Sequence, residues 1–150
     1  VYHVGYDGSG NSLTLANGAS LFASNLWIGT TANARSNAVV VTDAGTRLDT
    51  PTLYVGNTSS WSQLNILNGG VVSNIYGYIG YEAASSNNSV LVSGAGSLWA
   101  NSGGLLVGQD GSMNRLTVST GGTVVVDGWL AVGGASSSNL RYFNWSQHRQ

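Results

Sequence analysis

The feature that most constrains this chain is an internal repeat marked by a Val-Gly or Ile-Gly dipeptide. The dipeptide occurs six times, at residues 4–5, 28–29, 55–56, 79–80, 107–108 and 132–133. Successive glycines are 24, 27, 24, 28 and 25 residues apart, so that short and long units alternate. Units of this size that share one register predict a solenoid, in which each unit forms one coil and stacks on its neighbours.

Apolar and polar residues alternate within each unit, as expected for strands with one buried face. The opening strand carries two apolar residues, and the second of them should form one buried column through the stack. This column comprises Leu15, Val41, Ile66, Val92 and Val118. A glycine-rich turn, a second short strand and a third strand follow, and the third strand ends at the dipeptide.

We therefore predict an all-β fold, a single β-solenoid domain over residues 1–150 with about six coils of 24–28 residues and three short strands per coil. The coils are predicted to begin near Gly5, Gly29, Gly56, Gly80, Gly108 and Gly133, with the last coil incomplete. The alternative is a β-sandwich, which also has many short strands but requires no shared register between distant segments.

One polar column lies two residues before the first inward residue of each unit. Its members are Asn11, Asn37, Ser62, Asn88 and Asn114, and an alignment without gaps places Arg141 there in the last unit. Stacked amides can hydrogen-bond from rung to rung, as Asn ladders do in cross-β structures. We predict that the four asparagines form an internal structural ladder.

A second column lies one residue before the apolar residue of each dipeptide and should face outward. Its members are His3, Trp27, Tyr54, Tyr78, Leu106 and Ala131. A contiguous exposed apolar surface usually marks an interaction site. Trp27, Tyr54 and Tyr78 are thus a candidate contact stripe for carbohydrate or for a second copy of the chain. The alternative is that these rings pack on one another across the strands.

The charge pattern excludes several classes of function. Charged residues make up 7% of the chain, against roughly 25% in an ordinary domain. The net charge is −1 and all five basic residues are arginine, so we expect no nucleic-acid partner. No apolar run approaches the ~18 residues that span a bilayer, and we expect no membrane insertion.

The residues that could carry chemistry are few. Glu82 and Asp110 each follow an anchor glycine by two residues on adjacent units, and such a pair could bind Ca²⁺ or act as acid and base. Solvated turn carboxylates are the alternative that we favour. His3 and His148 lie at opposite ends of the chain, so neither can complete a triad in the body of the fold. We predict no enzyme, no catalytic residue, no metal and no cofactor.

Two units carry a resemblance to known repeats. Residues 88–99 read N-x-V-x-V-x-G-x-G-S-x-W, and residues 114–124 read N-x-L-T-V-x-x-G-G-x-V. This alternation resembles the repeats of bacterial autotransporter passengers and of surface proteins with a PEP-CTERM sorting signal. The resemblance implies a right-handed β-solenoid that is exported to the bacterial cell surface or beyond.

Three functions remain open: a structural fibre subunit, an adhesin that binds glycan, and a polysaccharide-degrading solenoid enzyme. The charged residues are too few and too scattered for the enzyme. The predicted function is a non-enzymatic extracellular structural protein that assembles head to tail into a filament. The alternative is an adhesin or passenger fragment that uses the aromatic stripe on a glycan or host surface.

The chain ends underlie the prediction of self-assembly. The first residues form the third strand of a long coil, and the last residues form the first strand of another. When the last unit is aligned without gaps to the other long units, Phe143 takes the first apolar position of this strand. Trp145 then takes the second apolar position, which Val41 occupies in the first long unit. Stacking two chains would join these partial coils, although an excised fragment would have the same open ends. The predicted assembly residues are Val1, Tyr2, Val4, Phe143 and Trp145.

Overall fold

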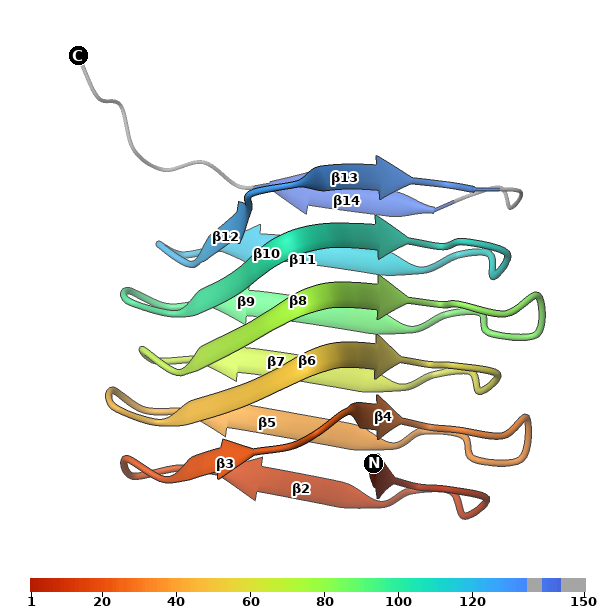
Figure 1. Cartoon of the computed structure of the whole chain (residues 1–150), viewed down its shortest axis with the longest axis horizontal. Coiled ribbons are helices and arrows are strands. Elements are labelled where there is room, and N and C mark those ends of the chain that lie inside the picture. The colour runs from red at the N-terminus through yellow and green to blue at the C-terminus, as the bar shows by residue number, and fades with distance from the viewer. Residues whose placement is uncertain (135–138, 144–150) are drawn as a thin grey trace.

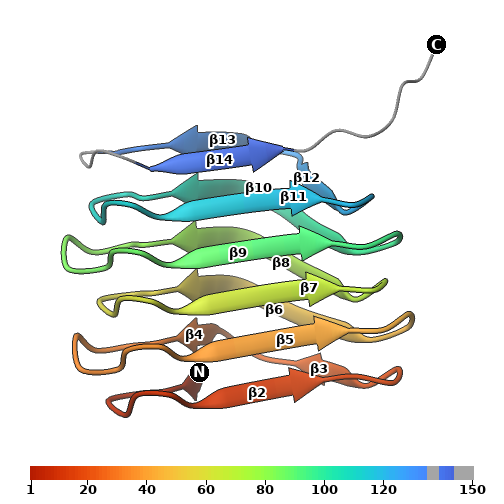
Figure 2. The same cartoon turned by 180° about the vertical axis from the view of Figure 1, so that it is seen from behind.

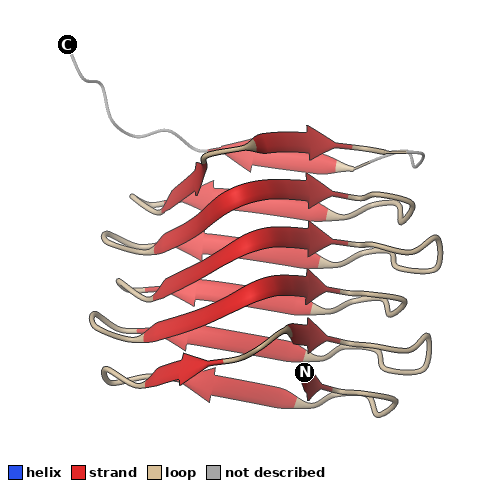
Figure 3. Ribbon diagram, viewed as in Figure 1, coloured by secondary structure: helices blue, strands red, loops and turns tan. Residues whose placement is uncertain are grey.

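The described residues of the chain form a stack of parallel strands and contain no helix (Figures 1 and 3). The computed structural model describes residues 1–134 and 139–143. The strands wind into a β-solenoid of about five turns, which confirms the predicted fold class. Within these residues there is accordingly no helix of the length and apolar character needed to cross a membrane.

The first strands of the coils form one parallel sheet, which faces the viewer in Figure 2. Its members are β2 (Ser12–Leu15), β5 (Ala38–Thr42), β7 (Gln63–Leu67), β9 (Ser89–Ser93), β11 (Arg115–Ser119) and β14 (Leu140–Phe143). Each strand pairs with its equivalents in the coils before and after it, in the order β2-β5-β7-β9-β11-β14. Segments about 25 residues apart in sequence therefore lie side by side.

The remaining strands form the second parallel sheet. Its members are β1 (Tyr2–Val4), β3 (Ser20–Phe22), β4 (Leu26–Ile28), β6 (Arg47–Val55), β8 (Val71–Ile79), β10 (Leu98–Val107), β12 (Thr123–Val126) and β13 (Trp129–Val132). Three separate strands per coil, as predicted, occur only towards the ends of the stack. In the middle coils the second and third strands run together as the bent strands β6, β8 and β10 (Figure 1). In these coils, both halves of each long strand pair with the neighbouring coils. The hydrogen-bonded ladder therefore continues on both sides of the bend.

The core occupies the space between the two sheets. The second apolar residues of successive first strands are register partners, so they form one column. In coil order they are Leu15, Val41, Ile66, Val92 and Val118. Val41, Ile66 and Val92 are 0% exposed. The predicted inward column is therefore confirmed, and burial of each such side chain stabilises the fold by about 1.5–3 kcal/mol.

The register of the last coil differs from the alignment without gaps. Phe143 pairs with Val118, so it takes the second apolar position of its strand rather than the first. Asn139, and not Arg141, takes the asparagine position, because its Oδ1 accepts the backbone N–H of Asn114 at 2.9 Å. In sequence, Asn139 follows its anchor glycine by the same number of residues as the asparagine-column residue of a short unit, which is two fewer than in a long unit. Trp145, which the same alignment placed in the core, lies outside the described residues.

Candidate functional site

The asparagine column forms a hydrogen-bonded ladder inside the solenoid. Asn11 Nδ2 donates to Asn37 Oδ1, and Asn88 Nδ2 donates to Asn114 Oδ1, both at 3.0 Å. The same oxygens also accept backbone N–H groups from the preceding coil, such as that of Asn88 bonded to Asn114 at 3.0 Å. Ser62 interrupts the column, but its N–H donates to Asn88 Oδ1 at 2.8 Å. Asn37, Asn88 and Asn114 are buried and hydrogen-bonded, whereas Asn11 in the first coil is exposed, so the role of the ladder is to hold coils together.

The ladder explains the anchor glycine in four units, where an asparagine of the next coil occupies the space that a Cβ would need. The six anchor glycines have φ angles between +72° and +79°, a region that favours glycine. A Cβ at Gly56 would lie 2.3 Å from Asn88 Nδ2, and one at Gly80 would lie 2.0 Å from Asn114 Nδ2. The amide of one coil therefore packs directly on the glycine of the coil before it. Sequence reasoning identified both columns but missed this contact between them.

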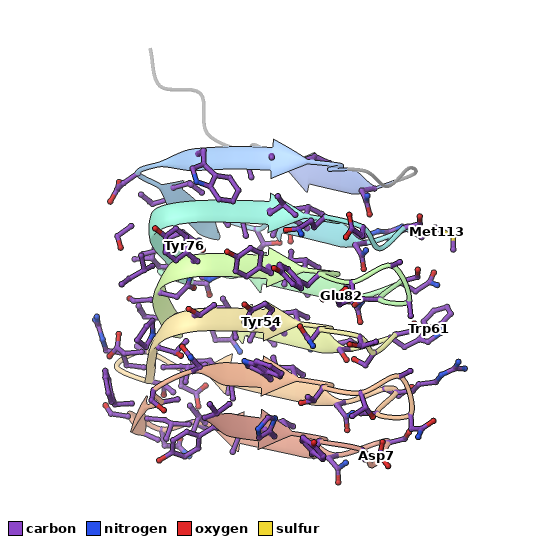
Figure 4. The ribbon with its side chains drawn as sticks, turned by 45° about the vertical axis from the view of Figure 1, so that its right-hand side comes forward. Asp7, Tyr54, Trp61, Tyr76, Glu82 and Met113 are labelled. Carbon is purple, nitrogen blue, oxygen red and sulfur yellow. The ribbon has the colours of Figure 1, made fainter. Side chains whose placement is uncertain are left out.

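The predicted stripe is a continuous stack of rings on the outer face of the second sheet. Trp27 lies 5.2 Å from Tyr54 between ring centroids, and Tyr54 lies 4.9 Å from Tyr78 in a stacked arrangement (Figure 4 labels Tyr54). All three side chains are half-buried. They are therefore outside the core, and the rings cover one another across the strands to a large extent.

Two tyrosines that sequence reasoning missed widen this stack. Tyr81 packs edge-on against both Tyr54 and Tyr78, at 5.2 and 5.0 Å. At the first coil, His3 links Tyr6 to Trp27 through edge contacts of 5.1 and 5.5 Å. Tyr6 and Tyr81 both follow an anchor glycine directly, and this shared position is the signal that could have identified them.

The environment of the stripe raises the pKa of two of its phenols. Burial raises the pKa of Tyr54 above its ordinary value, and the neighbouring Tyr78, Tyr81 and Glu82 raise it further. Burial also raises the pKa of Tyr78, together with Tyr81 and Tyr76. Tyrosine hydroxyls are ordinarily protonated at neutral pH, so both can donate hydrogen bonds, and the raised pKa values extend this state to higher pH.

The acidic pair lies on the turns. The backbone N–H of Asp110 bonds to the carbonyl of Tyr81, so Glu82 and Asp110 lie on adjacent coils. Glu82 is exposed and Asp110 is half-buried. Asp7, whose turn is labelled in Figure 4, accepts hydrogen bonds from Thr31 and Asn33. Among the described residues, no three His, Asp, Glu or Cys side chains group as a metal site requires.

The edge formed by the first coil leaves part of the core uncovered. Leu13, Leu15 and Leu21 are only half-buried, whereas Val39 and Leu48 at the equivalent positions one coil on are 0% exposed. A cavity of about 310 Å³ opens at this edge. Its lining includes Tyr2, Val4, Leu13, Leu21 and Leu26. Of the predicted assembly residues, Val1 and Tyr2 are exposed and Val4 is buried in β1.

A second concavity follows the bend of the long strands. It has a volume of about 350 Å³ and receives residues from β3, β6, β8 and β10. Sequence reasoning did not anticipate this groove, because it depends on the angle at which the two halves of each long strand meet. The only available signal was a set of small residues, Ser73, Ala100 and Ser102, near the middle of those segments.

Large apolar side chains also project from two of the turns. Trp61 and Met113 are both exposed, and both have positive φ angles, +64° and +58° (Figure 4). They occupy the same turn position in two short units that are separated by one long unit. Exposed apolar residues at conformationally unfavourable positions are available for contact with a partner.

No protein-family model, no curated protein and no solved structure matches this chain.

Proposed function

We propose that this protein is a non-enzymatic extracellular structural protein, in which solenoids of identical chains stack end to end into a rod or filament. The observation that carries the proposal is that each coil pairs in parallel with the next, so a second copy can continue both sheets. Strands β1, β2 and β3 each pair with one neighbouring strand in the described structure, and the backbone N–H and C=O groups on their other sides can bind a further strand. The half-buried Leu13, Leu15 and Leu21 lie at the same edge.

The other end of the described stack is a suitable partner for this edge. Val124, Val126 and Val132 of β12 and β13 are also half-buried. All strands of the solenoid are parallel, so a second copy can continue both sheets in the same direction. Such a contact is heterologous, and it generates an open filament when its rotation does not close. Burial of the apolar edge would contribute about 25 cal/mol per Å².

Low charge supports the same proposal. The net charge is −1 and only 7% of residues are charged, so identical chains meet little electrostatic repulsion. The extracellular location is supported by the resemblance of residues 88–99 and 114–124 to exported repeat proteins.

The stacking edge can be tested by a pair of substitutions on one strand. In β2, Leu13 points to the core edge and Thr14 points outward. Light scattering and electron microscopy across a range of concentrations should show rods for the natural chain and for Thr14→Asp. Leu13→Asp should give monomers, because it places a charge at the contact. A natural chain that stays monomeric at every concentration would refute the proposal.

A second candidate function is glycan adhesion through the stripe, and the continuous stack of half-exposed rings favours it. The hydroxyls of Tyr54 and Tyr78 are neutral donors, and the rings offer apolar edges. Trp27→Ala combined with Tyr54→Ala should abolish retention on a glycan column, while circular dichroism remains that of a β-protein. The control is Thr117→Ala, an outward position on the opposite sheet. Equal retention of both variants would exclude the stripe as a glycan site.

A further inference from the structure

We infer that the groove along the bend of the long strands is a binding site for a neutral polysaccharide. The groove is lined by residues of β6, β8 and β10, and the bend of these strands is visible in Figure 1. Its volume of about 350 Å³ falls in the range of roughly 300–1,000 Å³ typical of ligand sites. It shares no lining residue with the aromatic stripe or with the cavity at the first coil, although Phe22 belongs to β3 of that coil.

Each middle coil contributes one residue before the bend and one after it. Before the bend, Asp49 pairs with Ser73, and Ser73 with Ala100. Two positions further along these strands, Pro51, Ile75 and Ser102 also line the groove, and the pairing of β8 with β10 shifts register between Asn101 and Gly104. In each of the three middle coils, one of these two groove residues is polar and the other is apolar. A ligand that lies along the groove therefore meets one hydrogen-bonding group and one apolar surface at each step of about 4.8 Å.

A chain of pyranose rings has the matching chemistry. Each sugar unit carries hydroxyl groups at its edge and C–H groups on its faces, so polar and apolar contacts repeat together along the polymer. Phe22 at one end of the groove is 71% exposed and pairs with Asp49 on the next coil. Its ring is a platform on which the apolar face of a sugar can pack.

The backbone argues against a peptide ligand. Peptides commonly bind sheets by adding a strand to an open edge. Strand β8 lies between β6 and β10 in the sheet order, and β10 lies between β8 and strands β12 and β13. The groove thus crosses the middle of the sheet, where the long strands have neighbours on both sides, so a peptide has no open edge there and side chains must supply most of the contacts.

The charges argue against a polyanionic ligand. The lining includes the carboxylates of Asp49 and Asp127 and no basic side chain. Arg47 lies close by, but its Nε is bound to Asp49 Oδ2 at 2.6 Å. Taken together, these three groups carry a net negative charge, which disfavours uronic acids, sulfated sugars and nucleic acids. The carboxylates accept hydrogen bonds well from the hydroxyls of an uncharged sugar.

The test is native gel electrophoresis of the full chain in gels that contain a polysaccharide. The neutral probes are hydroxyethyl cellulose, galactomannan and dextran, and the anionic probe is polygalacturonate. At least one neutral probe should retard the protein, and polygalacturonate should not. Phe22→Ala and Ala100→Trp should each weaken binding at least tenfold, because one removes the platform and the other fills the groove. Thr117→Trp, an outward ring on the opposite sheet, is the matched control.

Three outcomes would contradict the groove as the binding site. No retardation by any of the three neutral probes overturns the inference, as does retardation by polygalacturonate. Binding that survives Phe22→Ala and Ala100→Trp but is lost with Trp27→Ala and Tyr54→Ala would assign sugar to the stripe instead. Phe22 is exposed, so its substitution tests the groove even if Ala100→Trp alters the fold.

Discussion

At the scale of single residues, the solenoid depends on a pairing of glycine and asparagine between neighbouring coils. The asparagine amide supplies a hydrogen bond to its own type and to the backbone of the preceding coil. It can approach so closely only because the anchor glycine beneath it has no side chain. The anchor glycine and the column asparagine, which recur separately along the sequence, are therefore in contact between neighbouring coils in the structure.

Gly80→Ala tests this contact, with Gly10→Ala as its control. Both glycines have positive φ angles, +74° and +72°, but an added Cβ would lie 2.0 Å from Asn114 Nδ2 at Gly80 and meets nothing within 4 Å at Gly10. Gly10→Ala should lower the free energy of unfolding by about 1–2 kcal/mol, the cost of the left-handed conformation. Gly80→Ala should lose at least about 2 kcal/mol more in urea titrations, because it also displaces a buried amide. Equal losses would mean that backbone conformation alone selects the glycine.

At the scale of the strands, the bend is supported by an interior chain of polar side chains. Trp99 is fully buried in β10, and its Nε1 donates to Asn74 Oδ1 at 2.6 Å. Asn74 Nδ2 in turn donates to Asn101 Oδ1 at 2.6 Å. These groups lie where the long strands change direction, so the bend is held from inside by hydrogen bonds as well as by packing.

The ring stack on the outer side of β6 and β8 predicts a loss of stability in alkali. The pKa values of Tyr54 and Tyr78 are raised in the folded state, so the folded chain keeps protons that the unfolded chain releases above about pH 10. Stability should therefore be complete below that pH and fall as the pH rises through the folded pKa values.

The double variant Tyr54→Phe, Tyr78→Phe should show a smaller decline. The measurement is the thermal midpoint by circular dichroism at a series of pH values from 8 upward. The two proteins are compared by their slopes against pH, so a constant difference in stability does not affect the result. Identical slopes would contradict the role of these two phenols.

At the scale of the whole molecule, the solenoid is a short rod with an apolar core that extends to both of its described ends. A solenoid has no closed surface along its axis, and each coil is stabilised by the coil on either side. The core residues of the first coil and those of β12 and β13 are half-buried, because within the described residues they have fewer neighbouring strands than the core residues of the middle coils.

Assembly through these ends has a defined diffraction signature. If chains stack with both sheets continuous, the strand spacing persists across every junction. Oriented rods should give a reflection at about 4.8 Å along the rod axis, and electron microscopy should show a constant width. Rods in which the strands lie parallel to the long axis would place the reflection across it and would contradict end-to-end stacking.

The candidate sites differ in how far the sequence could predict them. Trp27, Tyr54 and Tyr78 were found because alternate residues of a strand share a face. Tyr81 was missed, because it lies beyond the anchor glycine, where the chain turns and the alternation ends. The groove at Ser73 and Ala100 was missed altogether, because it needs the relative direction of two strand segments, which no residue pattern states.

By itself, the sequence determined the coil length, the inward column from Leu15 to Val118 and the asparagine column, because each follows from spacing along one chain. Only the tertiary structure decided the fusion of strands into β6, β8 and β10, the register that brings Asn139 into the ladder, and the mutual covering of the rings. Those features depend on how neighbouring coils approach one another. Hydrogen bonds and side-chain contacts between coils, rather than local preference, select among the registers and bends that the sequence allows.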